Sequence, residues 1–292
     1  MKILMATDGS PDASIALLTA ARLLRKDSDV TVLCVAPPPP HRGRHKLIEY
    51  EGRIRKETDR ILADATQLLA SEGFQAAAIT DSGSAAEVIL RHASDYDLTV
   101  IGAKGRNLRQ DVGLGPVAGI LVDRMRSPLL IGRGMPPDPE GRILVAVDGS
   151  TYGRREIEIL RDGMALEGRE ITLMHVVETP WVHLGLDQDW GEFIEEKPDH
   201  VEPALEVDRT MHVQAATIVN RASVGLEGFH AGLSTVIVDG IPGDEILSET
   251  DTGSYDLAVL GSTGSNDVKH QMLGSVAAKV AWNARCSVLL AR

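Results

Sequence analysis

Short runs of aliphatic residues alternate along the whole chain with stretches in which apolar residues recur every three or four positions. The second pattern is typical of an amphipathic helix, and the first is typical of a buried strand. In the first half we therefore expect strands at residues 3–7, 30–36, 76–80, 98–103 and 128–131. The helices expected between them cover residues 11–24, 54–73, 85–93 and 116–125. For the first of them we expect Ser10 as the N-cap and Pro11 as the first helical residue. Apolar strands joined by helices predict an α/β fold, with a parallel sheet covered on both faces.

The same pattern occurs again in the second half, together with parts of the sequence itself. Residues 2–10 (KILMATDGS) return 140 positions later as residues 142–150 (RILVAVDGS). Residues 97–102 (DLTVIG) return 159 positions later as residues 256–261 (DLAVLG). The second copy therefore has 19 more residues in its middle than the first.

A short segment rich in proline and glycine, residues 133–141 (RGMPPDPEG), lies between the two copies. Such a composition is typical of a linker. We therefore expect two domains of one kind, residues 1–134 and residues 141–292. Duplicated domains tend to pack together, so we expect an intramolecular pseudo-dimer, and a homodimer of the whole chain is also compatible with the sequence.

The composition restricts both the cores and the partners. Apolar residues form 43% of the chain but aromatic residues only 3%, so aliphatic side chains must fill the cores. The formal charge of −12 argues against a general affinity for nucleic acid or anionic membranes. No apolar run is long enough for a signal peptide or a membrane span, so we expect a cytoplasmic protein. Cys34 and Cys286 match no ligand spacing, and both precede or lie in apolar strand-like runs, so we expect buried, reduced thiols.

Two kinds of loop recur where ligands of parallel α/β sheets bind, beyond the carboxyl ends of the strands. The first is the turn Asp8-Gly9-Ser10, which returns as Asp148-Gly149-Ser150. The second is a series of glycines after the fourth strand. Glycines let the backbone approach phosphate oxygens, and the helix that follows directs free N–H groups at an anion. The glycines are Gly102, Gly105 and Gly115 in the first half and Gly261, Gly264 and Gly274 in the second.

The second-half glycines and the residue after the last of them have the spacing G-x2-G-x9-G-S. Placed after the fourth strand of such a domain, this spacing resembles the ATP-binding signature of the universal stress protein family. The resemblance covers nearly the whole chain, twice. It implies a Rossmann-like domain in each half, with five parallel strands in the order 3-2-1-4-5. It also implies an adenine nucleotide as the ligand, either ATP or its shorter relatives AMP and ADP, and is compatible with Mg²⁺ beside the phosphates.

The resemblance also implies roles for individual residues. In the second half, the strand end at Ala146, the side chain of Asp148 and the backbone of Val176 would hold the adenosine. The phosphates would be held by Gly261, Gly264, Gly274, Ser275 and Val276. The corresponding first-half residues are Asp8, Val35, Gly102, Gly105, Gly115 and Val117. Pro116 takes the place of Ser275 there, and it has neither a backbone N–H nor a hydroxyl, so we expect the second half to carry the better site.

Charged residues near the loops have two interpretations. Lys104, Arg106 and Arg109 could steer phosphates towards the first-half site, or they could belong to a solvated loop. Residues 179–210 form an acidic insertion with two tryptophans in the second half, whereas residues 41–56 of the first half are rich in basic side chains. Such runs are usually solvated, although opposed charges could also face each other or attract a partner.

The histidines raise the question of a metal site. His175, His183, His200, His212 and His230 all lie in the second half. None forms a compact pair with a third ligand at a recognised spacing, so we assign no metal site.

Several enzyme classes lack their motifs. Neither half contains the P-loop, the dinucleotide-binding G-x-G-x-x-G in its proper turn, or the G-x-S-x-G elbow. The Asp-Gly-Ser turns resemble those of haloacid dehalogenase-type phosphatases, but Ala6 and Ala146 stand where those enzymes have their nucleophilic aspartate. We therefore assign no catalytic residue.

We interpret the chain as an adenine-nucleotide-binding sensor or regulator of the stress response. Two alternatives stay open. The first is a chaperone-like or protein-interaction module that needs no nucleotide and keeps the repeat as a scaffold. The second is a slow ATPase.

Overall fold

The first half of the chain forms five strands and four helices in regular alternation. The computed structural model describes residues 1–38, 44–106, 113–138, 140–149, 153–178, 198–228, 232–261 and 273–292. The first-half strands are β1 (Lys2–Ala6), β2 (Asp29–Ala36), β3 (Ala76–Ser82), β4 (Leu98–Gly102) and β5 (Leu129–Gly132). The helices are α1 (Pro11–Leu23), α2 (Arg44–Ser71), α3 (Ala85–Ala93) and α4 (Pro116–Arg124). All these elements were predicted, and α3 has the predicted bounds.

The second half repeats this order. Its strands are β6 (Arg142–Ala146), β7 (Glu170–Val177), β8 (Gly232–Asp239), β9 (Leu257–Gly261) and β10 (Ser287–Ala291). Its described helices are α5 (Gly153–Gly163), α8 (Pro198–Gly225), α9 (Pro242–Thr252) and α10 (Ser275–Asn283). Of the predicted insertion, residues 179–197 lie outside the described residues, and the remainder forms the first part of α8.

All ten strands form a single sheet in the order β3-β2-β1-β4-β5-β10-β9-β6-β7-β8. Within each half this is the predicted order 3-2-1-4-5 with parallel neighbours. No feature of the sequence had indicated that the two sheets would join. They do so through β5 and β10, which pair antiparallel with Leu130 opposite Leu289. The halves therefore form an intramolecular pseudo-dimer related by an approximate two-fold axis between these strands.

Two arginines strengthen this junction symmetrically. Arg133 is only 7% exposed, and its guanidinium donates hydrogen bonds of 2.6 Å to the carbonyl oxygens of Ala281 and Ala284, at the end of α10. Arg292 likewise donates to the carbonyl oxygen of Val122 in α4. Helix C-termini leave carbonyl oxygens without intrahelical partners, so a buried guanidinium is well placed there. Each half thus caps a helix of the other.

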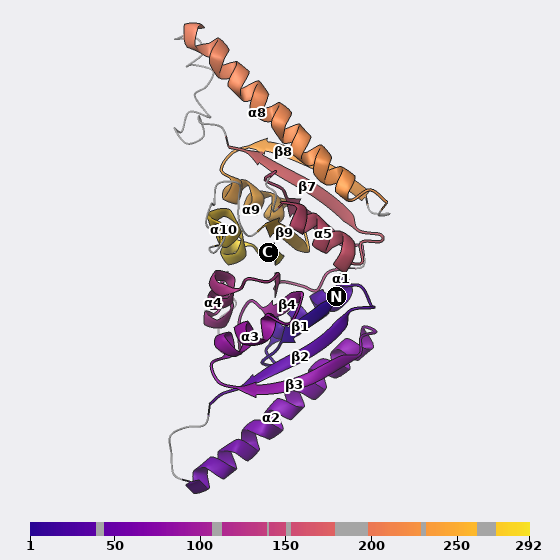
Figure 1. Cartoon of the computed structure of the whole chain (residues 1–292), viewed down its shortest axis with the longest axis vertical. Helices are drawn as coiled ribbons and strands as arrows, with labels where there is room; N and C mark the ends of the chain where they lie inside the picture. Colours follow the sequence, from indigo (N-terminus) through magenta and orange to yellow (C-terminus); the bar gives the residue numbers. More distant parts are fainter. Residues whose placement is uncertain are drawn as a thin grey trace.

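Aliphatic side chains fill the space on both faces of the sheet, as the low aromatic content predicted. The helices α1, α2, α5 and α8 cover one face, and α3, α4, α9 and α10 cover the other (Figure 1). The long helices α2 and α8 lie at opposite ends of the molecule (Figure 1). Among the residues that the structure describes, no helix is both long and apolar enough to cross a membrane.

Local details confirm two of the sequence predictions and correct a third in part. The Ser10 hydroxyl caps α1 by accepting a 3.2 Å hydrogen bond from the N–H of Ala13, and Pro11 is the first helical residue. Both cysteines are free thiols. Cys34 is buried as predicted, but Cys286 is only partly buried, because it precedes β10 instead of lying within it.

Candidate functional site

The predicted adenosine residues of the second half lie at one edge of the sheet. β6 pairs in parallel with both β7 and β9, so the carboxyl ends of the three strands meet there. Ala146 ends β6 and Asp148 follows it, while Val176 is the penultimate residue of β7. The chain runs from β6 to β7 and β8 on one side of β6, and the connection after β8 then crosses to β9 on its other side. This reversal makes the end of β6 the switch point at which such sheets bind ligands.

Two of the predicted phosphate residues, Gly261 and Gly274, lie where β9 ends and where α10 begins. Gly261 is the last residue of β9, and Gly274 is the N-cap of α10 with φ −62° and ψ 147°. The helix starts its own hydrogen bonding with the N–H of Ala278, which donates to the Gly274 carbonyl oxygen over 2.9 Å. The N–H groups of Ser275 and Val276 are therefore not used within the helix. Gly264 lies outside the described residues.

His175 contributes to the positioning of the turn after β6. Its Nδ1 lies 2.6 Å from the Val147 carbonyl oxygen, which can only accept, so Nδ1 carries the proton. The Val147 N–H donates in turn to the Met174 carbonyl oxygen over 2.9 Å. These bonds hold the start of the Asp148 turn against β7.

Glu156, a residue for which the sequence predicted no role, lies buried behind Gly261. It belongs to α5, and its side chain is 1% exposed. A Cβ placed on Gly261 would lie 2.5 Å from Glu156 Oε1, so a side chain at this position would require the carboxyl group to move. Glu156 Oε2 has no hydrogen-bond partner among the described residues. Burial, together with the negative charge of Asp148, raises the pKa of Glu156 to about 8, so the carboxyl group is largely protonated at neutral pH.

The first domain repeats the arrangement of strand ends and glycines. Asp8 follows β1, Val35 lies near the end of β2, and Gly102 ends β4. Gly115 is the N-cap of α4, with φ −71° and ψ 166°, and its N–H donates to the Ala103 carbonyl oxygen over 2.8 Å. Val117 is the second residue of α4. The predicted residues of this half therefore come together as well.

The close packing of α1 on the end of β4 explains why residue 102 is a glycine. A Cβ on Gly102 would lie 2.6 Å from the backbone nitrogen of Ala13, at the start of α1. No side chain can be accommodated there without moving the helix. Gly102 therefore has a packing role in the first domain whether or not a nucleotide binds.

Arg106 spans the first-domain crevice. Its backbone N–H donates to Asp8 Oδ2 over 3.3 Å, and its Nη1 lies 2.9 Å from Glu57 Oε1 in α2. A Cβ on Gly9 would lie 2.5 Å from Arg106 Nη2, so the guanidinium lies directly over the Asp8 turn. The other oxygen of Asp8 accepts from the N–H of Ser10 over 2.9 Å. Groups of its own chain therefore engage both carboxylate oxygens of Asp8.

Arg106 was predicted either to steer phosphates or to belong to a solvated loop. Its exposed side chain pairs with Glu57. Hydrogen bonding from Arg60, together with that from Arg106, lowers the pKa of Glu57 to about 2. A Cβ on Gly105 would lie 2.9 Å from Asp8 Oδ2, which shows how tightly this loop packs on the turn. Lys104 accepts a 3.3 Å hydrogen bond at its carbonyl oxygen from the Ser10 hydroxyl. Arg109 lies outside the described residues.

Comparison with known proteins agrees with this architecture. The chain matches the model of the universal stress protein family over residues 1–133 and 140–292. A universal stress protein of Mycobacterium tuberculosis is 24% identical over 99% of this chain and 96% of its own length. One from Methanocaldococcus jannaschii is 26% identical over 52% of this chain and 81% of its own length.

Solved structures show the same fold. A universal stress protein from Archaeoglobus fulgidus superposes with a TM-score of 0.66 at 18% identity, covering 100% of this chain and 98% of that one. A protein from Pseudomonas aeruginosa described as a putative universal stress protein gives 0.56 at 16% identity, covering 99% and 92%. With two matches to the family model that together span nearly every residue, the chain belongs to the universal stress protein family, as a member with two domains in tandem.

Proposed function

We propose that this chain binds an adenine nucleotide, ATP first of all, in its second domain and acts through that binding as a sensor or regulator of the stress response. The observation that carries the proposal is the start of α10. There Gly274 has no side chain to cap the helix, the N–H groups of Ser275 and Val276 are not used within it, and Val276 packs against the same apolar cluster as Ala146 at the end of β6. Such an N-terminus suits an anion, and the strand ends beside it suit the nucleoside.

Each group of the site has a definite task in this proposal. Asp148 accepts hydrogen bonds from the ribose or the base, and the backbone of Val176 contacts the adenine. The N–H groups of Gly274, Ser275 and Val276, the Ser275 hydroxyl and the glycines at positions 261 and 264 receive the phosphates, with Mg²⁺ as their counterion. The protonated Glu156 adds no negative charge behind the phosphates at neutral pH.

A pair of matched variants tests the proposal. Gly274→Val places a branched side chain where the phosphates would approach, yet the φ and ψ of this residue are open to any amino acid. We expect the affinity for ATP to fall at least tenfold, which is about 1.4 kcal/mol, in calorimetric titration. Gly115→Val makes the same change at the N-cap of α4 and should leave the tighter site intact.

Nucleotide extracted with acid from the purified protein gives the complementary measurement. Adenine nucleotide at about one equivalent per chain would support the proposal. A well-folded Gly274→Val protein that binds ATP as tightly as the unmodified chain would reject it, and a protein that neither retains nor binds nucleotide would favour the interaction module. Phosphate release that depends on Gly274 would identify the slow ATPase.

A further inference from the structure

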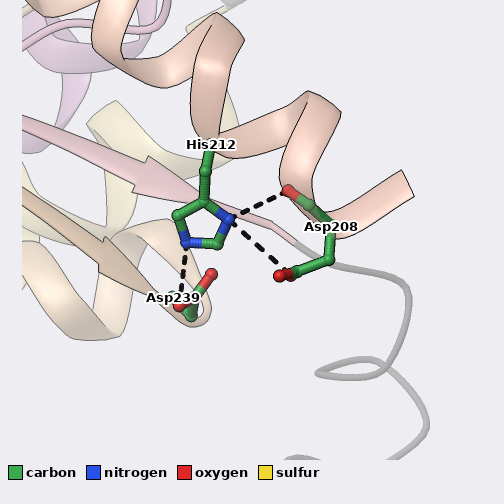
Figure 2. Close-up of side chains that lie close together, drawn as sticks. All are labelled: Asp208, His212 and Asp239. Atoms are coloured by element: carbon green, nitrogen blue, oxygen red, sulfur yellow. Dashed lines mark hydrogen bonds and ion pairs between the residues drawn. The ribbon is translucent and has the colours of Figure 1, made fainter. Parts of the chain in front are cut away.

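Three potential metal ligands lie together at the outer end of the second domain. Asp208 and His212 are one turn apart in α8, and Asp239 is the last residue of β8 (Figure 2). One ligand atom from each residue lies within 4.8 Å of those of the other two. The side chains of Asp208, His212 and Asp239 are 37%, 39% and 51% exposed, so an ion could enter from solvent.

The hydrogen bonding of His212 determines which ring nitrogen could bind an ion. Its Nδ1 lies 3.0 Å from the backbone carbonyl oxygen of Asp208, and because a carbonyl oxygen only accepts, Nδ1 carries the proton. The lone pair of the neutral ring is then on Nε2, which points at Asp239 (Figure 2). Histidines that bind metals usually donate their second N–H in this way, to a carbonyl or carboxylate group that fixes the ring.

The distance on the Nε2 side also suits a metal. His212 Nε2 and Asp239 Oδ2 are 3.3 Å apart. Two donors that each lie about 2.0–2.1 Å from a tetrahedral ion are about 3.3–3.4 Å from each other. Asp208 Oδ1, now 3.7 Å from Nδ1, is on an exposed side chain that can turn towards the ion. Water would fill the remaining position.

We propose that Asp208, His212 and Asp239 form a binding site for a divalent ion of the zinc class. One imidazole and two carboxylates favour Zn²⁺ and its first-row neighbours over Mg²⁺ and Ca²⁺, which prefer oxygen ligands alone. This site is separate from the proposed nucleotide site and does not depend on it. The sequence pattern led us to assign no metal site, because Asp239 is 27 positions after His212 and comes close only through the packing of α8 beside β8.

The first domain contains no such set at the corresponding place. Gly9 lies next to Ile61 of α2, and the equivalent Gly149 lies next to Ile218 of α8. Ile61 and Ile218 are therefore equivalent positions, which aligns α2 with α8. Ser82 pairs with Ala36 at the end of β2, and Asp239 pairs with Val177 at the end of β7. The strand registers therefore make Ser82 and Asp239 equivalent. By this alignment Asp208, His212 and Asp239 correspond to Glu51, Arg55 and Ser82. The three first-domain residues line a cavity of about 500 Å³ and include no histidine.

A second histidine provides a matched control. His92 Nε2 lies 2.8 Å from Asp81 Oδ2, so it too faces a carboxylate. Arg91 Nη2, however, lies 2.8 Å from the same oxygen. A guanidinium at that oxygen repels a metal ion and leaves the pair without a third ligand, so His92 should bind none.

Titration of the metal-free, nucleotide-free full-length chain with ZnCl₂ tests the site. We expect the unmodified chain to take up one equivalent that His212→Arg, which introduces the first-domain residue, loses or binds at least tenfold more weakly. Asp239→Ser should act in the same direction, and His92→Arg should have no effect. Zn²⁺ should also raise the melting temperature of the unmodified chain more than that of His212→Arg. MgCl₂ should produce no comparable binding.

Two results would overturn the assignment. One is a folded His212→Arg protein that binds Zn²⁺ with the same stoichiometry and affinity as the unmodified chain. The other is an unmodified chain that takes up no Zn²⁺, which would reduce the cluster to an ion pair between α8 and β8. Neither result depends on ATP, so failure here is distinct from failure of the proposed nucleotide site.

Discussion

The first helices of the two domains carry different residues at one equivalent position, Ala16 in α1 and Glu156 in α5. Ala16 is buried against Gly132, where an added Cβ would lie 2.3 Å from the Ala16 Cα. Glu156 is equally buried but places a carboxyl group behind Gly261. The backbone of the crevice is thus alike in the two domains, with the same strand ends and the same glycine caps. The side chains that determine its charge differ.

A second difference lies on the opposite wall of the crevice. In the first domain Glu57 of α2 holds Arg106 across the Asp8 turn. The residue of α8 that corresponds to Glu57 is Gln214, which is neutral. Together with Pro116 in place of Ser275, this difference leads us to expect that the first-domain crevice is the less suitable one for phosphate. The two copies of the fold therefore share the backbone arrangement of the site but differ in the few side chains that would determine how it binds a ligand.

Separating the two domains should have the largest effect. Each half alone would expose the free edge of β5 or β10, and Arg133 would lose both carbonyl partners in α10. Uncovered sheet edges and unpaired buried groups favour association. We expect residues 1–138 and residues 141–292, expressed separately, to self-associate in sedimentation experiments. Soluble monomeric halves as stable as the full chain would show that the junction contributes little.

The next largest effect should be the dependence of stability on pH caused by Glu156. Its pKa is about 8 in the folded chain and near 4.5 when unfolded, so the folded state binds more protons between these values. The free energy of unfolding therefore falls as pH rises from about 4.5 to about 8. Glu156→Gln has no proton to lose, so its stability relative to the unmodified chain should improve by roughly 4 kcal/mol between pH 5 and pH 9.

Urea denaturation at a series of pH values measures this difference. Glu158→Gln is the control, because Glu158 lies in the same helix, is about half exposed and pairs with Arg155 over 3.4 Å. Its pH profile should match that of the unmodified chain. Parallel profiles for Glu156→Gln and the unmodified chain would mean that Glu156 is ionised in the folded protein at neutral pH.

Sequence alone predicted the features that depend on local chemistry. The Ser10 and Pro11 start of α1 and the glycine caps of α4 and α10 were all predicted, because a cap or a close turn needs particular residues at fixed spacing. The antiparallel pairing of β5 with β10 was not predicted, because the sequence of a four-residue apolar strand is the same whether the strand lies at the edge or in the middle of a sheet. Glu156 was missed because a glutamate in an amphipathic helix is expected to face solvent.

Exchanging the residues that follow the two glycine caps should change the ATP stoichiometry. Pro116 lacks the N–H and hydroxyl that Ser275 offers, and a hydrogen bond to a charged group contributes about 1.5–3 kcal/mol. We expect the unmodified chain to bind close to one equivalent of ATP and Pro116→Ser to approach two. The reciprocal Ser275→Pro should weaken the second-domain site, since proline also fits the first turn of α10. Two equal sites in the unmodified chain would contradict this expectation.

The smallest effect should come from releasing Arg106. Glu57→Gln introduces the second-domain residue and removes the partner that lies 2.9 Å from the Arg106 guanidinium. The guanidinium would then be able to meet a phosphate, so in the Pro116→Ser background we expect the first-domain site to bind ATP a few-fold more tightly. Because both side chains are about 40% exposed, salt screens their pairing, and the gain should be clearest in titrations at low ionic strength. Asp64→Asn is the matched control, because it removes a carboxylate of the same helix that pairs with Arg60 over 3.2 Å. Among the described side chains, the ion-pair partner of Arg106 is Glu57 and not Asp64. If Glu57→Gln instead weakens ATP binding, the expectation is wrong, and the ion pair with Glu57 holds Arg106 in a position where it can contact the phosphates.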